Sequence, residues 1–329
     1  MTTHPNVAGA TAPRRDAAGP SDSRPGADGT GVARPGHTGR GRGGPGRRGG
    51  RWLAQVGWRH VAGVLAVAFS LFPILFVLSA ALNPLGTLSS TELLPTGASL
   101  ENFGNLFERT EFGRWFLNSL LIAGGASFAS IFLSALAAYA FSRMRFAGRR
   151  FGLLTLLLIQ MFPQFLAIVA IFLIFSRVTD LWPSIGFNTP WGLFLLYLGG
   201  ALGMNTWLMK GFFDTLPREL DESATMDGAS HAQVFFRIML PLVAPILAVT
   251  ALLSFIGTIN EFMIANVFLT DTGSKTLAVG MFGLVAGERN NNFGIFAAGT
   301  LLTAIPTVLV FQLLQRYIVS GLTAGAVKG

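Results

Sequence analysis

The chain has 329 residues, of which 51% are hydrophobic and only 12% are charged, with a mean hydropathy of +0.54. A soluble domain normally carries about 25% charged residues, so this composition excludes an ordinary soluble domain and indicates a membrane protein. The net charge of +8 does not indicate a nucleic-acid partner, because ten Arg and three Asp before Val61 account for +7 of it.

Residues 1–58 are rich in Gly, Pro and Arg and almost lack large apolar side chains. Burial cannot offset the entropy of ordering such a segment, so we predict a disordered cytosolic tail. Its basic run Arg40–Arg51 could bind anionic membrane lipid or, as a weaker alternative, RNA. It could also serve only to fix the topology.

Six segments without charged residues follow, each long enough for the ~20 residues that cross a bilayer. Because backbone amides in hydrocarbon must be satisfied within the segment, we predict six transmembrane helices in a domain over residues 59–319. The expected fold is therefore an all-α membrane protein, with helix bends at its prolines. The six segments are Val61–Leu82, Trp115–Phe141, Phe151–Phe175, Pro190–Met209, Pro241–Asn260 and Phe293–Leu314, and the prolines in these spans include Pro73, Pro163, Pro245 and Pro306.

The distribution of Lys and Arg predicts the orientation. With the N-terminus inside, 19 of the 24 basic residues fall in the tail and the inner loops. The positive-inside rule then places both termini in the cytoplasm. Residues 320–329 are accordingly predicted to form a cytosolic C-terminal tail.

Residues 214–241, between the fourth and fifth spans, are predicted to form two short helices joined at a glycine. Thr215 or Leu216 is expected to cap the first helix. Gly228 is expected to end it by adopting the left-handed conformation that other residues resist. Ser230 is expected to cap the second helix, which leads into the fifth span.

The loop contains Glu222-Ser-Ala224, then after two residues Asp227-Gly228-Ala229, and ends on Leu240-Pro241. Their spacing, directly before the penultimate span, resembles the EAA loop of ABC importer permeases, which forms a coupling helix that docks in a groove of the ATPase subunit. Ser223 stands where the family usually has Ala, and its small side chain should fit the same space. The alternative, an amphipathic loop on the inner leaflet, is disfavoured because the five acidic residues of the loop would be repelled by an anionic surface. The residues to which the resemblance assigns ATPase coupling are Glu222, Ser223, Ala224, Asp227, Gly228, Ala229, Leu240 and Pro241.

Further segments are similar to the smaller permease subunit of maltose and maltodextrin importers, namely Thr276–Met281, Phe296–Ala298 and Gln315–Gly329. The resemblance implies a type I importer permease, multi-pass in the bacterial cytoplasmic membrane. Its implied partners are a second, non-identical permease subunit, two ATPase subunits and an external sugar-binding protein.

The same resemblance implies roles for two more segments. The outer loop 270–292 would contact the binding protein, and the tail Gly321–Gly329 would contact the ATPases. The sugar contacts could lie wholly on the partner permease. The candidate contact residues in the outer loop are Asp271, Thr272, Gly273 and Ser274.

The chain carries no motif for catalysis or cofactor binding. Lys210, Lys275 and Lys328 are its only lysines, and none follows a glycine as a phosphate-binding loop requires. ATP and Mg²⁺ are therefore expected on the partner ATPase, and this subunit is not expected to be an enzyme. Zinc-ligand spacing is also missing among the four His.

Amide side chains inside the spans provide a hypothesis for the transport path, because placing amides in lipid is costly. We hypothesise that Gln164 and Asn260 face the path. Hydrogen bonding between helices is the alternative.

The sequence therefore predicts the permease subunit of an ATP-driven sugar importer, with maltose or maltodextrin as the first candidate and another oligosaccharide as the alternative. An ion-coupled secondary transporter would need ionisable groups inside its spans, and the six predicted spans contain none. A membrane scaffold acting through its Arg-rich tail would lose its function when residues 1–50 are deleted, whereas an importer would retain uptake.

Overall fold

The computed structural model describes residues 57–87, 89, 97–200, 202–286 and 292–326, and the regular elements within these ranges are all helices. The side chains of Gln164 and of residues after Ile318 are not among those described. The predictions for the basic tail up to residue 56 and for the side chains of the C-terminal tail lie outside the described part. Val61–Gly329 forms one compact unit by its internal contacts, and the following concerns that unit.

The described regular elements include α-helices and shorter turns. Shorter 3-10 turns occur at Gln164–Ala167, Pro183–Ile185 and Thr272–Ser274, and a π turn at Phe235–Met239. The α-helices are α2 (Trp58–Leu82), α3 (Glu101–Arg109), α4 (Phe112–Arg143), α5 (Arg149–Met161), α6 (Ile168–Leu181), α7 (Pro190–Gly199), α8 (Met204–Thr215), α9 (Glu219–Met226), α10 (His231–Val234), α11 (Leu240–Leu242), α12 (Ala244–Ile259), α13 (Met263–Phe268), α14 (Leu277–Ala286) and α15 (Phe293–Ala326).

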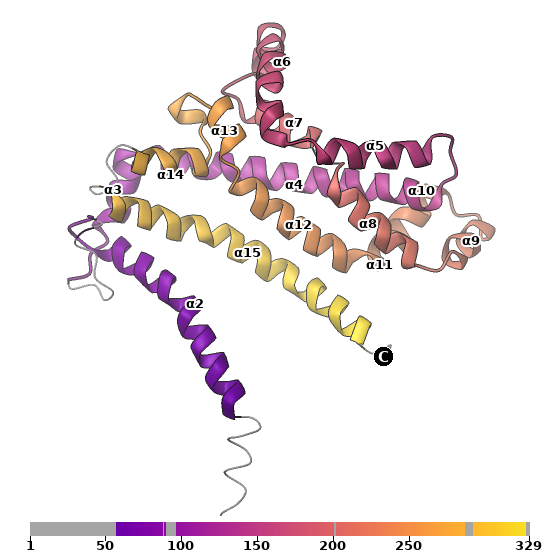
Figure 1. The fold of residues 1–329 in the computed structure, drawn as a ribbon, viewed down its shortest axis with the longest axis horizontal. Helices are drawn as coiled ribbons and strands as arrows, with labels where there is room; N and C mark the ends of the chain where they lie inside the picture. Colours follow the sequence, from indigo (N-terminus) through magenta and orange to yellow (C-terminus); the bar gives the residue numbers. More distant parts are fainter. Residues whose placement is uncertain (1–56, 88, 90–96, 201, 287–291, 327–329) are drawn as a thin grey trace, which may run out of the picture. The chain divides into compact units, whose positions relative to one another are not determined.

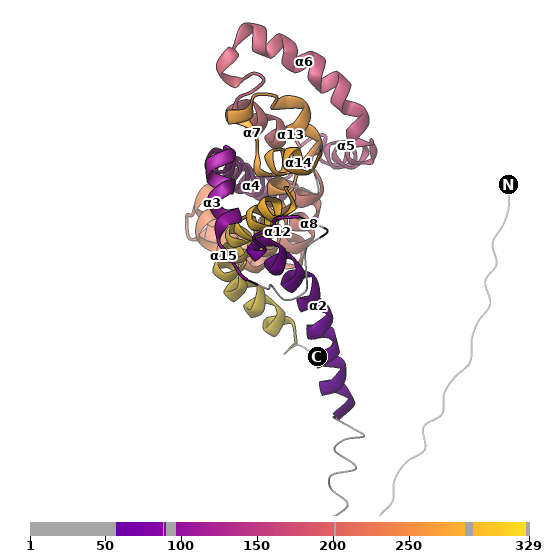
Figure 2. The same ribbon diagram turned by 90° about the vertical axis from the view of Figure 1, so that its left-hand side faces the viewer.

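Helix α4 is the element around which the others pack. It contacts α7, α8, α12 and α14, and α12 lies between α4 and α15 (Figure 1). Figure 2 shows α6 on the side of α7 and α13 and away from α15. Small side chains along α4 allow this close approach of several helices. The small residues on its buried side include Ala123, Ala126, Ser127, Ser130, Ser134, Ala135 and Ala138.

Two glycines fix the packing near the first turn of α4. The ring of Trp115, which is 5% exposed, lies against Gly280 of α14, where an added Cβ would come within 2.2 Å of the indole. Asn102 of α3 lies in the same way against Gly294 of α15, and its amide donates a hydrogen bond to the carbonyl of Ala81 (3.0 Å). A larger residue at either glycine would force these helices apart.

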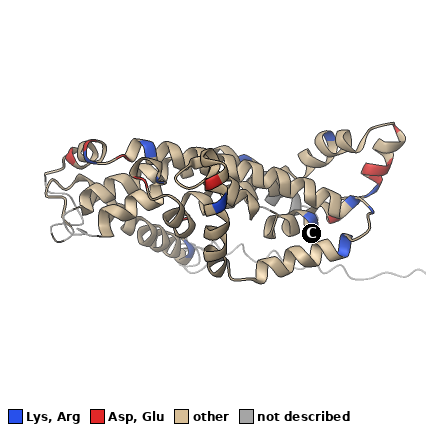
Figure 3. Ribbon diagram, turned by 90° about the horizontal axis from the view of Figure 1, so that it is seen from above, with Lys and Arg blue, Asp and Glu red and all other residues tan. Residues whose placement is uncertain are grey.

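The six predicted spans correspond to three continuous helices and three bent pairs. By length and composition, Trp58–Leu82, Phe112–Arg143 and Phe293–Ile318 can each cross a membrane, and the described chain has up to six spans if each bent pair counts as one. The bent pairs are α5 with α6, α7 with α8, and the segment His231–Leu242 with α12. Figure 3 shows long stretches of ribbon without Lys, Arg, Asp or Glu; in the sequence, α12 has no charged residue and α15 has only Arg316.

Two of the four prolines lie at breaks between helices. Pro163 lies at the break after α5, and Pro245 lies in the first turn of α12, directly after a bend of 78°. Pro73 and Pro306, in contrast, lie inside the continuous helices α2 and α15. At these two positions the flanking apolar turns continue the helix despite the lost hydrogen bond.

Candidate functional site

The predicted coupling loop, residues 214–241, contains α9, a glycine turn and α10. Gly228 has φ = 85°, in the left-handed region, as predicted. The amide of Ala229 donates to the carbonyl of Ala224 (2.9 Å), and that of Gly228 to the carbonyl of Thr225 (3.0 Å). These two bonds form a Schellman motif, which satisfies the last carbonyls of α9 and reverses the chain.

Ser230 caps the second helix as predicted. Its hydroxyl accepts a hydrogen bond from the amide of Gln233 (3.3 Å), and its own amide donates to the side-chain oxygen of Gln233 (2.8 Å), which completes a capping box.

The predicted cap of the first helix is wrong, because α9 begins only at Glu219, after Arg218. Thr215 is instead the last residue of α8, and its hydroxyl donates back to the carbonyl of Phe212 (2.7 Å). Acidic side chains in the first turn of α9 stabilise its start through the helix dipole.

One side of the loop is buried against α4 and α8. Ala224 of α9 is 9% exposed, and Tyr139 of α4 contacts both Phe235 and Phe213, with ring centroids 5.2 and 5.9 Å apart. The π turn that follows α10 brings Phe235 and Met239 into the same cluster. The loop is therefore packed onto the bundle by apolar contacts rather than hanging from it.

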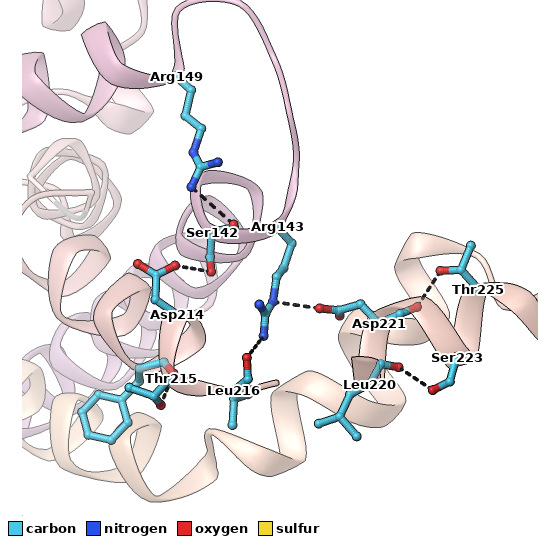
Figure 4. Close-up of polar contacts among 11 residues, drawn as sticks. Ser142, Arg143, Arg149, Asp214, Thr215, Leu216, Leu220, Asp221, Ser223 and Thr225 are labelled. Carbon is cyan, nitrogen blue, oxygen red and sulfur yellow. Dashed lines mark hydrogen bonds and ion pairs between the residues drawn. The ribbon is translucent and has the colours of Figure 1, made fainter. Parts of the chain in front are cut away.

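A charged network ties α9 to the last turn of α4 (Figure 4). Arg143 Nε lies 2.8 Å from Asp221 Oδ2, and the two side chains are only 7% and 18% exposed. Arg143 Nη2 also donates to the carbonyl of Leu216 (2.8 Å), just before α9. Beside it, Ser142 Oγ donates to Asp214 Oδ1 (2.6 Å), at the end of α8. The end of α4 thus holds both sides of the chain that enters α9.

The Arg143–Asp221 contact is an ion pair rather than an aligned hydrogen bond, because neither Asp221 oxygen accepts a well-oriented donor within the described part of the chain. Burial raises the pKa of Asp221 above its ordinary value, and the neighbouring Arg143 and Arg218 only partly oppose this effect. Burial therefore outweighs the attraction of these two guanidinium groups, so the charged form of this carboxyl costs the folded loop free energy relative to the protonated form.

The other side of α9 is exposed. Glu222, Ser223 and Asp227 are exposed, and Met226 is 88% exposed although its side chain is apolar. A cavity of about 750 Å³ opens between α9 and the end of α4, lined by Arg143, Arg145, Arg218, Asp221, Glu222 and His231, among others. A helix with one buried and one projecting face can bind a partner while remaining attached to the bundle.

The structure thus separates the predicted coupling residues. Glu222, Ser223, Asp227 and Gly228 are accessible, Ala229 is half-buried and Ala224 is buried beneath them. Leu240 and Pro241 lie in α11, where they line an apolar groove of about 420 Å³ with α4, α12 and α15. Arg143 was missed, because the sequence showed it only as one of several basic residues in an inner loop.

The predicted binding-protein contact residues Asp271, Thr272, Gly273 and Ser274 form a short turn that is tied to α4. Trp115 Nε1 donates to the carbonyl of Thr272 (2.8 Å), and Asn118 Nδ2 donates to the carbonyls of Gly273 and Lys275 (both 3.1 Å). Asp271 and Thr272 remain exposed. Residues 287–291, near the C-terminal end of the predicted outer loop, lie outside the described residues.

Asn188 holds the same turn from its other side by hydrogen bonds. It adopts φ = 59°, and its Oδ1 accepts hydrogen bonds from the amides of Thr270 (2.6 Å) and Asp271 (3.0 Å). Asparagine tolerates this left-handed conformation better than most residues. The turn is therefore held by hydrogen bonds both from the start of α4 and from Asn188, which lies just before α7.

Of the two predicted pathway residues, Asn260 is the one whose side chain the structure describes. Asn260 is exposed, and its amide donates to the carbonyl of Ile256 in its own helix (2.8 Å). The side chain of Gln164 lies outside the described part. A polar pair that the sequence did not indicate lies nearby, since Tyr197 Oη donates to Glu261 Oε2 (2.6 Å).

Comparison with known proteins decides the family. Residues 130–323 match the model of the family described as "Binding-protein-dependent transport system inner membrane component". The chain belongs to this family. The family match includes the whole coupling loop.

Curated relatives support the assignment over most of the chain. The galactooligosaccharides transport system permease protein GanQ of Bacillus subtilis is 41% identical over 78% of this chain and 90% of its own length. The maltose/maltodextrin transport system permease protein MalG of Escherichia coli is 39% identical over 82% of this chain and 95% of its own length. The predicted resemblance to ABC importer permeases is therefore confirmed.

A solved structure supports the fold. A chain of a bacterial ABC transporter involved in the import of the acidic polysaccharide alginate covers 82% of this chain and 98% of its own length, with a TM-score of 0.67 and 22% identity. A member of this family is a multi-pass inner-membrane component, as predicted. The all-helical type I importer permease fold predicted from sequence is likewise confirmed.

Proposed function

We propose that this chain is the permease subunit of an ATP-driven oligosaccharide importer, and that α9 is the element through which a separate ATPase moves it. The relatives support the substrate class, because they are named for galactooligosaccharide, maltodextrin and maltose transport. Because these relatives are named for different sugars, we propose the substrate class, neutral oligosaccharides. Maltodextrin is the first substrate to test.

One observation carries the coupling role. Helix α9 is attached to α4 through the Arg143–Asp221 pair and the buried Ala224, while Glu222 and Met226 project away from the bundle. An exposed apolar side chain surrounded by acidic ones is suited to a groove on another protein. Movement of that protein would be passed to α4 and, through the π turn and α11, to α12.

The assembly that we propose follows the family description, which requires a binding protein. It contains a second, non-identical permease subunit, two ATPase subunits that carry ATP and Mg²⁺, and an external sugar-binding protein. Both termini and α9 lie on the cytoplasmic side, and the turn Asp271–Ser274 lies on the external side, where it contacts the binding protein.

The glycine turn offers a direct test of the coupling role. An added Cβ at Gly228 would meet no atom within 4 Å, so substitutions there act only through the backbone conformation. Proline cannot adopt φ = 85° and lacks the amide that bonds to Thr225, at a cost of about 3 kcal/mol or more. Asparagine accepts the left-handed conformation at a cost of about 1 kcal/mol or less.

We expect Gly228→Pro to reach the membrane and assemble but to lose ATP-dependent uptake of labelled maltotriose in proteoliposomes that contain the complete importer. Gly228→Asn is the matched control and should retain most uptake. Uptake by Gly228→Pro at the wild-type rate would show that the geometry of this turn does not carry coupling. Absence of ATP-dependent uptake of maltotriose and galactotriose by the wild-type assembly would refute the proposed function as a whole.

A further inference from the structure

A polar cavity of about 520 Å³ lies within the bundle, apart from the coupling loop. It is bounded by α4, α6, α7, α8, α12 and α13. Its lining is mixed but strongly polar for a membrane protein. The polar lining residues are Ser130, Tyr197, Asn205, Ser254, Thr258 and Glu261.

The cavity contains one carboxylate, which is held in a fixed orientation. Glu261 Oε1 accepts from the amide of Ile264 (2.8 Å), and Oε2 accepts from the amide of Ala265 (3.0 Å) and from Tyr197 Oη (2.6 Å). An ionised carboxylate has about four acceptor positions, so three donors leave room for one more. A half-buried carboxylate of this kind is expensive near a membrane interior and indicates a functional role.

Helices are interrupted where they line the cavity. Helix α7 ends at Gly199 and α8 begins at Met204, while α12 ends at Ile259, two residues before Glu261. Gly199, Gly200 and Asn205 all line the cavity. Irregular backbone at membrane depth is tolerated where it lines a water-filled cavity, because water or a polar ligand satisfies the freed groups.

The residues that line the cavity favour a neutral, hydroxyl-rich ligand. Hydroxyl and amide side chains both donate and accept, and the remaining acceptor position of Glu261 suits a ligand hydroxyl. The aromatic ring of Tyr197 offers an apolar face to a sugar ring. A metal or alkali cation would compete with the three donors that already occupy the Glu261 oxygens, so the geometry favours the sugar over the cation.

We infer that this cavity is a sugar-contact site on the translocation path, at which Tyr197 and Glu261 bind hydroxyls of the passing oligosaccharide. The inference rests on the proposed function. It differs from the expectation that sugar contacts lie wholly on the partner permease, and it replaces Gln164 and Asn260 with residues that meet in one cavity.

Gly257 of α12 provides a way to close the cavity without disturbing the Tyr197–Glu261 pair. It lines the cavity, and an added Cβ would meet no atom within 4 Å. Alanine or leucine there also favours the helix over glycine. Gly63 of α2 likewise has open space around an added Cβ and does not line this cavity, so Gly63→Leu is the matched control.

The experiment uses the complete importer in proteoliposomes, with labelled maltotriose and maltose as probes and with ATP hydrolysis measured in parallel. We expect Gly257→Leu to lower maltotriose uptake at least tenfold, while ATP hydrolysis stimulated by the sugar-loaded binding protein stays within twofold of wild type. Gly257→Ala should give a smaller loss, which keeps the test valid if the leucine variant fails to assemble. Gly63→Leu should transport normally.

Two further variants test the contacts themselves. We expect Tyr197→Phe and Glu261→Gln each to change the ratio of maltotriose to maltose uptake at least threefold, an effect that general destabilisation would not produce.

Wild-type uptake by Gly257→Leu, or an unchanged sugar ratio in both contact variants, would overturn the inference. So would a loss of sodium or proton dependence in Glu261→Gln, because it would identify a cation site. In each of these outcomes the wild-type assembly still imports sugar, so the proposed function would stand although this inference fails.

Discussion

The ion pair between Arg143 and Asp221 permits a quantitative test of how α9 is held. Removing one partner of a fully buried pair costs about 3–5 kcal/mol, whereas exposed pairs contribute about 0–1 kcal/mol. The two side chains here are 7% and 18% exposed, and Arg143 keeps its hydrogen bond to Leu216 when Asp221 is removed. We therefore expect Arg143→Met, which leaves the Asp221 carboxylate buried without a partner, to cost about 2–3 kcal/mol. Asp221→Leu should cost no more than about 1 kcal/mol, because it also removes the burial penalty of the carboxylate.

The double substitution separates the pair from its surroundings. With both charges replaced by apolar groups of similar size, no uncompensated charge remains buried, and the double variant should be close to wild type. A coupling energy of about 2 kcal/mol in this double-mutant cycle is the expected result. The exposed pair Arg114–Glu111, with an N–O distance of 3.8 Å and side chains 69% and 49% exposed, is the matched control, and Arg114→Met should have little effect.

Hydrogen exchange of the α9 amides in the assembled importer measures the free energy of detaching α9 directly, because local opening sets the exchange rate of these amides. A cost of 2–3 kcal/mol corresponds to roughly 30- to 150-fold faster exchange in Arg143→Met. Exchange within about threefold of wild type in Arg143→Met, or additive effects in the double variant, would refute the view that this pair holds α9 on α4.

Two further predictions concern the same loop and the turn opposite it. Because burial raises the pKa of Asp221, the folded loop binds the carboxyl proton more tightly than the unfolded chain does. The stability that this proton contributes is full below the ordinary carboxyl pKa and is lost as pH rises through the raised pKa. Hydrogen exchange of the α9 amides, corrected for intrinsic rates, should therefore slow on acidification, and faster exchange would contradict this sign. Asn188→Ala should free the amides of Thr270 and Asp271 and strain the backbone, at about 2–4 kcal/mol, and weaken binding of the external binding protein. Asn188→Asp keeps the acceptor oxygen and should bind the external binding protein nearly as wild type does. Equal binding by the wild type and both variants would show that this turn plays no part in that contact.

The parts of the structure that the sequence predicted correctly depend on local signals. Long charge-free segments predicted the helices, Gly228 predicted the left-handed turn, and Ser230 predicted the cap of the second helix. Each of these signals is complete within a few residues. The cap of α9 was predicted wrongly because the Thr215 hydroxyl could bond either to the helix before it or to the helix after it. It bonds back to a carbonyl of α8 and not forward to α9.

The contacts that hold the site could not be predicted in the same way. Tyr197 and Glu261 are 64 residues apart in the chain, and Asn188 and Thr270 are 82 apart. Such pairs form only when separate helices pack together, and nothing in the local pattern around one residue indicates its partner. Glu261 directly follows the fifth predicted span, and its hydrogen-bonded position in a cavity emerges only when α7 packs against α13.

The buried side of α4 has a mechanical consequence. Methyl and hydroxymethyl groups form shallow ridges, so we expect that α12 can slide along the middle of α4 by small distances. Near its C-terminal end, the rings of Tyr139, Phe213 and Phe235 interlock and resist such sliding. A displacement of α9 would therefore be passed rigidly to the C-terminal end of α4 and would lead to sliding between helices farther along α4. Helix α4 would thus hold α9 at one end and guide the movement of α12 along its middle.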